Sequence, residues 1–331
     1  MPARRPTLAA VVAVAMSCLF LTGCGGSDGG KTTAASEGAP TSAGERPACY
    51  PDCQGADLRS KNLIGVDLSG VDLTDALLTG AVLTNSILTD ATLTNADFEG
   101  AMLYGADLSG ASAANARFPN ANLIKANLSG SDLTDADFTK AEFSKVARTG
   151  IEKATFTNAD LTRADFTTAT LRTVDLSGLK MDGATLVKAR ADYVKLSESS
   201  LRGASIQEVD FMYGKLIGTD LTEADLTKAN LFEADLTDAD LTDASLPQSN
   251  PYKAVFRNAD LTEADARKVR FYRSDLTKAR ILRADLAGAS WDWADLTEAN
   301  LTGARGFEYG SPRPVFRQTV CPDGTRTDTG C

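Results

Sequence analysis

The chain has 331 residues and a formal net charge of −10, because 44 Asp and Glu residues outnumber 34 Lys and Arg residues, and it contains no histidine. Hydrophobic residues make up 43% of the sequence, which is enough for a folded core and argues against a disordered chain. The acidic balance argues against direct nucleic-acid binding, which needs a cationic surface against phosphate. The absence of histidine excludes Ser-His-Asp and Cys-His catalysis and zinc sites with histidine ligands.

The first segment has the features of a secretory signal. Arg4 and Arg5 form a short basic region, and the apolar stretch that follows is too short to cross a bilayer. The stretch runs into Leu21-Thr22-Gly23-Cys24, which resembles the lipobox of bacterial lipoproteins. This resemblance implies that residues 1–23 are a signal peptide. It also implies that Cys24 carries a lipid, which anchors the protein to the cell membrane on its extracytoplasmic side.

The segment after this cysteine is a predicted linker. Residues 25–47 are rich in Gly, Ser, Thr and Ala and have no hydrophobic period, which is typical of a flexible tether. We therefore assign residues 24–48 to the lipidated cysteine and the linker. Residues 49–55, which contain Cys49 and Cys53, form a predicted N-terminal cap.

The body of the chain repeats the motif Ala-Asp-Leu-x-x, as in Ala106-Asp107-Leu108. Large apolar residues recur every five positions from Leu58 to Phe143 and again from Ile151 to Leu301. Five steps along a helix rotate a side chain by about 140°, and five steps along a straight strand reverse its face, so neither element fits. The pattern fits a chain that turns every five residues, with the leucine and the small residue two positions before it pointing inward. Four turns close a square coil of about 20 residues, and such coils stack like parallel strands.

This repeat is similar to that of the pentapeptide-repeat proteins, and the resemblance covers residues 56–304. It implies an all-β fold, a right-handed quadrilateral β-helix of about 12 coils that is roughly 58 Å long at strand spacing. The repeats form a first stack over residues 56–143 and a second stack over residues 151–304. Phe143 and Ile151 are eight positions apart, so residues 144–150 are predicted to form a phase-shift loop between the stacks.

Both ends of such a stack need caps, because they expose unpaired strand edges. Besides Cys24, the predicted mature chain contains Cys49, Cys53, Cys321 and Cys331, which allow three disulfide pairings. The two ends lie about 58 Å apart by strand spacing, whereas bonded Cα atoms lie within about 7 Å. Distance therefore favours Cys49–Cys53 and Cys321–Cys331, the second within a C-terminal cap of residues 305–331. A four-cysteine zinc site and free thiols are the alternatives.

Outward positions 20 residues apart lie on one face of neighbouring coils. By this rule one face of the second stack carries Met212 and six aromatic residues: Tyr193, Tyr213, Phe232, Tyr252, Tyr272 and Trp293. The same face has a net charge of +1 on an otherwise acidic stack, from Arg172, Arg190, Lys253, Arg270 and Arg273 against Asp192, Asp210, Glu233 and Asp292. This composition indicates a binding face. The alternatives are side-chain ladders inherited through repeat duplication, and coverage of the face by the C-terminal tail.

The first stack has a smaller apolar patch on one face, which could support a homodimer: Ile64, Val82, Met102, Tyr104 and Ile124. The Asp of the motif recurs too often to mark a catalytic or metal site, and we expect it to hydrogen-bond the backbone of the corner. No nucleotide-binding loop and no calcium-binding repeat occurs in the sequence, so we expect no cofactor.

Together these features predict a non-enzymatic lipoprotein that presents a rigid β-helix to a protein or glycan of the cell envelope. The family resemblance offers an alternative, since some pentapeptide-repeat proteins imitate duplex DNA and protect topoisomerases from quinolones. The acidic surface fits that role, but gyrase is cytoplasmic and this chain carries an export signal. A purely structural spacer is a second alternative.

Overall fold

The computed structural model describes residues 44–147 and 150–331, which belong to one compact unit, Thr41–Cys331. The predicted signal peptide, Cys24 and most of the linker lie outside the described residues. No α-helix occurs in the described ranges, so none is present there that could cross a membrane.

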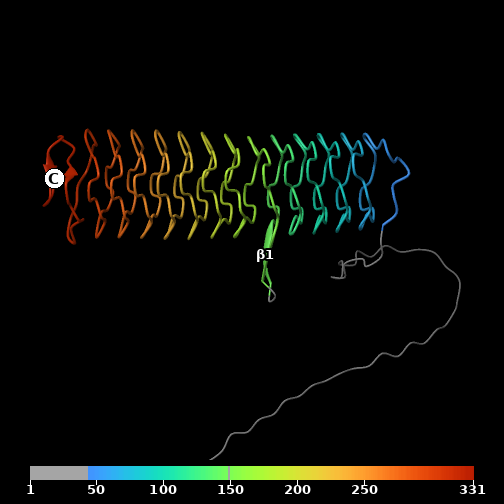
Figure 1. The fold of residues 1–331 in the computed structure, drawn as a ribbon, viewed down its shortest axis with the longest axis horizontal. Helices are drawn as coiled ribbons and strands as arrows, with labels where there is room; N and C mark the ends of the chain where they lie inside the picture. The colour runs from blue at the N-terminus through green and yellow to red at the C-terminus, as the bar shows by residue number, and fades with distance from the viewer. Residues whose placement is uncertain (1–43, 148–149) are drawn as a thin grey trace, which may run out of the picture. The chain divides into compact units, whose positions relative to one another are not determined.

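The described chain winds into a column of stacked coils (Figure 1). Residues 20 positions apart bridge in parallel, as in Asp57↔Leu77 and Leu77↔Asp97. The amide of Leu58 donates to the carbonyl of Leu77 at 2.8 Å, and the amide of Leu77 donates to the carbonyl of Ala56 at 2.9 Å. Each rung therefore bonds to the next coil in both directions, as in a parallel sheet.

A tight turn follows each inward leucine. The amide of Ala76 donates to the carbonyl of Leu73 at 3.0 Å, which closes one such turn. The residue before the closing amide is left-handed, with a φ of 56° at Asp75 and 65° at Gly80. Gly tolerates this conformation best and is frequent at this position of the repeat, although Lys, Glu, Asn and Asp also occupy it. The predicted turn every five residues is therefore confirmed.

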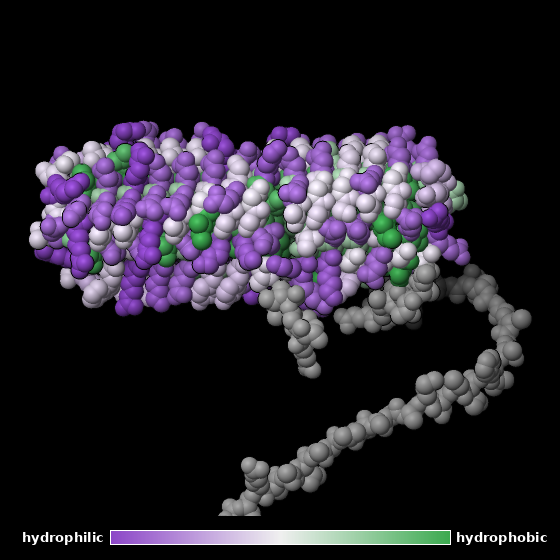
Figure 2. Space-filling view, in the orientation of Figure 1, coloured by the Kyte–Doolittle hydropathy of each residue, from purple (hydrophilic) through white to green (hydrophobic). Residues whose placement is uncertain are grey.

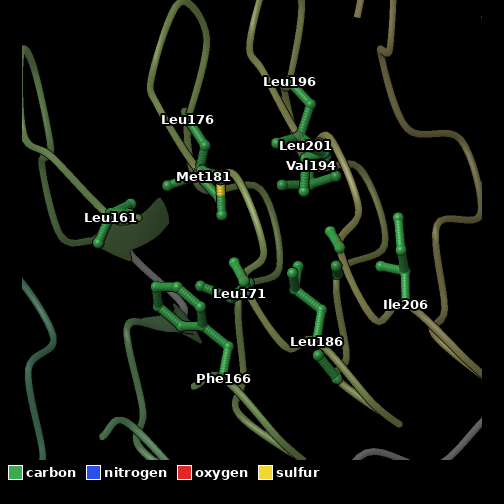
Figure 3. Packing of buried hydrophobic residues seen from close by; sticks show 14 of the residues in the cluster. Leu161, Phe166, Leu171, Leu176, Met181, Leu186, Val194, Leu196, Leu201 and Ile206 are labelled. Carbon is green, nitrogen blue, oxygen red and sulfur yellow. The ribbon is translucent and has the colours of Figure 1, made fainter. Parts of the chain in front are cut away.

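The core consists of the inward leucine or phenylalanine of each repeat and the small residue two positions before it. Leu68, Leu73 and Ala76 are fully buried, and most of their equivalents along the column are buried as well. Figure 3 shows such side chains pointing into the interior of successive coils. Burying one leucine contributes about 1.5–3 kcal/mol, so the repeat stabilises the fold along its whole length.

The predicted phase-shift loop is an antiparallel hairpin that projects from the column (Figure 1). Strands β1 (Ser144–Ala147) and β2 (Gly150–Lys153) pair from Ser144↔Lys153 to Ala147↔Gly150. Ile151 lies in β2 and does not open the second stack, which resumes at Ala154 and Phe156. The boundary expected at residues 150 and 151 is therefore wrong, because Gly150–Lys153 pair as a strand with Ser144–Ala147.

The core nevertheless continues past the hairpin. Across it, residues 28 positions apart bridge in place of residues 20 apart, as in Asn127↔Thr155. The buried rings of Phe118 and Phe138 stack at 5.0 Å, and those of Phe138 and Phe166 stack at 5.2 Å. The hairpin is thus an insertion in one corner of a single column.

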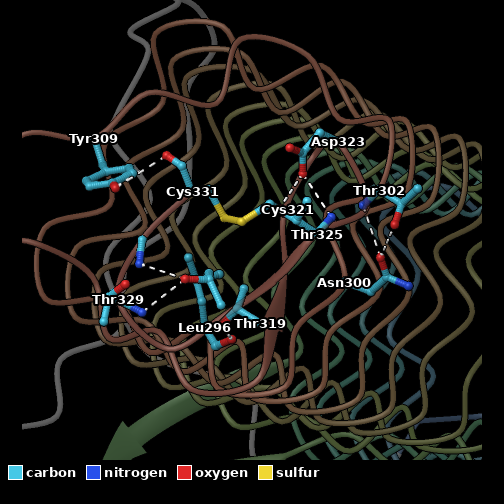
Figure 4. Close-up of a disulfide and its surroundings, with 12 residues drawn as sticks. Leu296, Asn300, Thr302, Tyr309, Thr319, Cys321, Asp323, Thr325, Thr329 and Cys331 are labelled. Carbon is cyan, nitrogen blue, oxygen red and sulfur yellow. Dashed lines mark hydrogen bonds between the residues drawn. A yellow bond between two sulfur atoms is a disulfide. The ribbon is translucent and has the colours of Figure 1, made fainter.

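Both ends carry the disulfides that the sequence favours. Cys49 and Cys53 are bonded with Cα atoms 4.9 Å apart, and Cys321 and Cys331 are bonded with Cα atoms 5.3 Å apart. The C-terminal tail contains a short hairpin, β3 (Thr319–Val320) and β4 (Arg326–Thr327). The Thr319 hydroxyl donates to the carbonyl of Leu296 at 2.7 Å, which ties this hairpin to the preceding coil (Figure 4).

Candidate binding face

The two patches predicted separately lie on one continuous side of the column. The rungs bridge in the order Asn122↔Glu142, Glu142↔Thr170, Thr170↔Arg190 and Arg190↔Asp210. This register joins the face of Leu123 in the first stack to the face of Phe211 in the second. We call this side the ladder face. Its inward residues are Leu63, Leu83, Leu103, Leu123, Phe143, Leu171, Ala191, Phe211, Leu231, Pro251, Phe271 and Trp291.

The Asp of the repeat has the structural role expected from the sequence. The Asp67 carboxylate accepts hydrogen bonds from the hydroxyl and the amide of Ser69, at 2.7 and 3.0 Å, and these bonds hold the pKa of Asp67 below its usual range. Asn300 receives the same two bonds from Thr302. Because an amide substitutes for the carboxylate at this position, the motif needs an oxygen acceptor and not a negative charge.

Five of the six predicted aromatic residues form a chain of ring contacts on the ladder face. Tyr193 and Tyr213 stack with centroids 4.8 Å apart, and Tyr213 meets Phe232 edge-on at 5.6 Å. Phe232, Tyr252 and Tyr272 then stack at 5.2 and 5.1 Å. We call these five residues the ring ladder.

The ring ladder presents hydroxyl groups and ring edges more than ring faces. Neighbouring planes within its two stacked groups differ by only 22°, 1° and 8°, so the rings cover part of each other's faces. None of its four tyrosine hydroxyls hydrogen-bonds to a described residue. A partner would therefore meet a row of phenol groups and the positive edges of the rings.

Trp293 differs from the ring ladder. Its side chain is 55% exposed, and it makes no ring or cation–π contact with any described residue. Trp293 also has a left-handed backbone, with a φ of 62°, as do Tyr193 and Tyr213 with 59°. A bulky residue in this conformation costs about 1 kcal/mol or more. The two tyrosines combine this backbone with ring contacts, whereas Trp293 has none among the described residues.

The charges of the ladder face are only partly paired. Arg172 bonds to Asp192 at 2.8 Å, and Lys253 bonds to Glu233 at 2.9 Å. Within residues 44–147 and 150–331, no carboxylate lies within ion-pair distance of three other cations on this face, Arg190, Arg270 and Arg273. The guanidinium of Arg273 instead lies 5.6 Å from the centroid of the Tyr272 ring. Met212 lies half-buried among these groups.

The C-terminal tail packs against the end of the column. Phe307 of the tail contacts the buried ring of Trp291 at 5.1 Å, and Tyr309 and Phe316 pack with Phe307. In the described structure no aromatic ring of the tail contacts the ring ladder.

The apolar patch of the first stack is partly covered by the chain itself. Ile124 is only 3% exposed, so it cannot contribute to the predicted dimer contact. Glu152 of β2 accepts a hydrogen bond from the Tyr104 hydroxyl at 3.1 Å and pairs with Lys125 at 2.8 Å. The bond to Glu152, with a weaker contribution from Tyr104, raises the pKa of Lys125 to about 12. At the N-terminal end of the patch, the amide of Gly44 donates a hydrogen bond to the carbonyl of Ile64. Val82 and Met102, which lie between Ile64 and Tyr104 along the face, are half-buried.

The described surface holds hollows but no cluster of metal-ligating side chains. A hollow of about 740 Å³ lies between residues 44–49 and 56–63, and a second of about 430 Å³ lies at the base of the β1–β2 hairpin. Nowhere in the described ranges do three Cys, Asp or Glu side chains gather as metal ligands would. On the side shown in Figure 2, hydrophobic residues are scattered among polar ones.

Comparison with known proteins gives a consistent result. A family profile described as pentapeptide repeats matches well over half of the chain in eight copies, over residues 52–90, 76–112, 101–139, 116–146, 152–186, 215–248, 254–290 and 274–305. No curated protein matches. Among solved structures, HetL of Nostoc sp. strain PCC 7120, a pentapeptide repeat protein involved in heterocyst differentiation regulation, is 25% identical. The match covers 82% of this chain and 91% of HetL, with a TM-score of 0.24.

Two further solved structures illustrate the range of similar proteins. A pentapeptide repeat protein of the Arabidopsis thaliana thylakoid lumen is 30% identical over 36% of this chain and 71% of its own, with a TM-score of 0.16. QnrB1, a plasmid-mediated fluoroquinolone resistance protein, is 15% identical over 72% of this chain and 88% of its own, with a TM-score of 0.22.

Proposed function

Because the chain belongs to the pentapeptide-repeat family, whose members are generally non-catalytic, we propose that it is a non-enzymatic scaffold anchored to the cell membrane by a lipid on Cys24. Residues 24–48 tether a rod of about 12 coils, closed at each end by a disulfide-bonded cap. The ladder face of this rod binds a protein or glycan of the cell envelope.

Trp293 carries the proposal for this face. It is more than half exposed, lacks a stacking partner among the described residues and has a backbone conformation that disfavours a bulky side chain. Glycine or asparagine at this position would relieve the backbone, as glycine does at other corners. A large aromatic residue that adds no evident stability is best explained by contact with a partner.

A capture experiment tests the binding face. The full chain and a variant with Tyr213, Tyr252, Tyr272 and Trp293 replaced by Ala are immobilised and exposed to envelope extract. We expect the variant to lose the captured material. The matched control carries Ala at four threonines of another face, the half-buried Thr222, Thr242 and Thr262 and the exposed Thr302. Equal capture by the wild type and the ring variant would overturn the proposal.

The lipid anchor needs its own test. Labelling with palmitate should modify the wild type and not a Cys24→Ala variant, and only the wild type should fractionate with membranes. An unlabelled wild-type protein in the cytosol would overturn the anchor. It would also favour the DNA-mimic alternative, to which the acidic faces of the column remain suited.

A further inference from the structure

We propose that the ladder face binds a linear acidic glycan, one whose repeating units carry carboxylate or phosphate groups. This inference rests on the proposed function and specifies the ligand class of that face. It follows from three features of the ladder face: the unpaired guanidinium groups, the orientation of the rings and the hollow at the hairpin base.

The unpaired cations are spread along the face. Arg190 and Arg270 are 80 residues apart in sequence, hence four coils apart, or about 19 Å at strand spacing. Arg273 lies three positions after Arg270 on the same coil. Other faces pair their arginines with carboxylates: Arg202 bonds to Asp220 at 3.2 Å, and Arg280 lies 3.4 Å from Asp260. The exposed arginines of the ladder face are thus available to bidentate acidic groups of a partner.

The rings favour oxygen-rich acidic groups over stacked neutral sugars. A sugar that stacks on an aromatic residue needs an open ring face, and the ring ladder covers many of its faces by its own stacking. The exposed edges carry partial positive charge, and the four phenol hydroxyls can donate hydrogen bonds to anionic oxygens. Ring faces stay open at the two ends of the row, at Tyr193, which stacks with Tyr213 alone and is 49% exposed, and at Trp293, which is 55% exposed.

The hollow at the hairpin base would receive an acidic group at the other end of the row. Its lining includes the cationic side chains of Lys145, Arg172 and Arg190 and the carboxylate of Glu142, and Arg172 is paired with Asp192 at 2.8 Å. Ser144 also lines it, and this buried residue has a hydroxyl without a hydrogen-bond partner among the described residues. The charge balance of this lining is positive, although the chain as a whole is acidic.

A regular linear polymer suits this arrangement better than a folded protein. The ladder face repeats its rings on successive coils along the column, from Tyr193 to Tyr272, and an extended ligand can follow such a row. The acidic faces do not repel the ligand strongly at physiological salt, because screening acts over about 8 Å.

Affinity for matched glycans tests the inference at 150 mM salt. The probes form two matched pairs. Polygalacturonate carries carboxylates and is paired with its neutral methyl ester, and phosphomannan carries phosphates and is paired with neutral mannan. We expect the full chain to bind one acidic glycan at least about tenfold more tightly than its neutral counterpart, since several exposed ion pairs contribute up to about 1 kcal/mol each. The acidic probe that binds distinguishes carboxylate from phosphate.

Two variants with the same change in charge complete the test. The ladder-face variant carries Arg190→Gln, Arg270→Gln and Arg273→Gln, and the control carries Arg202→Gln, Arg280→Gln and Arg283→Gln. The first should lose about tenfold in affinity and the second less than threefold. Equal losses, equal binding of neutral glycans, or no binding of either acidic glycan would overturn the ligand class. Envelope capture that still depends on the rings would then show that the face binds something else.

Discussion

The ladder face differs between its two halves, although both belong to one column with one core. In the first half, the chain covers its own apolar groups: Glu152 of the hairpin holds the Tyr104 hydroxyl, and Ile124 is buried. In the second half, the tyrosine hydroxyls have no partner among the described residues and Trp293 is 55% exposed. The comparison teaches that the fold does not by itself leave tyrosines of this face without partners. In the first half, Glu152 of the hairpin accepts a hydrogen bond from Tyr104, and no such segment of the described chain reaches the tyrosines of the second half.

The shared core gives the largest predicted effect. Phe138 is fully buried between Phe118 and Phe166, so Phe138→Ala should cost about 3–5 kcal/mol in the free energy of unfolding. Because the core continues past the hairpin, hydrogen exchange should accelerate in coils on both sides of it. Phe256→Ala, well inside the second half, is the control. Acceleration confined to residues before the hairpin would show that the halves are separate stacks.

The two ends should respond differently to loss of their disulfides. Cys321–Cys331 spans 10 positions and Cys49–Cys53 spans four. Replacing the first pair by Ser should lower the free energy of unfolding by about 2–3 kcal/mol and replacing the second by about 2 kcal/mol, because a longer loop gains more chain entropy. Denaturant titrations of both variants measure this, and a larger loss at the N-terminal pair would contradict it.

The ring ladder and Trp293 should separate stability from binding. Tyr213→Asn removes two ring contacts and should cost about 1 kcal/mol, less any relief of its left-handed backbone. Trp293→Asn removes no ring contact and should leave the melting temperature unchanged or slightly higher. Both should weaken envelope capture. Destabilisation by Trp293→Asn as large as that by Tyr213→Asn would give Trp293 a structural role instead.

The smallest predicted effect concerns Glu152 of the hairpin, which contacts Lys125 and Tyr104 of the first half. The hydrogen bond from Lys125 lowers the pKa of Glu152 below 4.5, its ordinary value. The contribution of this pair is therefore complete above pH 4.5 and is lost as the pH falls through the lowered pKa. Amide exchange in β1 and β2 should increase relative to the core in that acidic range, and Glu152→Gln should remove the extra pH dependence. An unchanged profile in that variant would mean that another group holds the hairpin.

Much of the fold could be predicted from the sequence. A period of five with Leu and Ala inward allows no regular helix or straight strand, so a turn at every fifth residue follows from side-chain geometry alone. The same period places Tyr193, Tyr213 and Tyr252 on one face, and distance along the column favours the two local disulfides. These predictions depend only on local repetition.

The tertiary structure decided what happens at the break in the repeat. Ile151 has the right spacing and polarity for an inward residue, and only the antiparallel pairing of β1 with β2 places it in a hairpin. That pairing sets the register Glu142↔Thr170, which joins the two patches into one face. The sequence period fixes only the phase within a run of repeats. The number of residues that the hairpin removes from the coil is set by hydrogen bonds between residues far apart in sequence, as in the bridge Asn127↔Thr155.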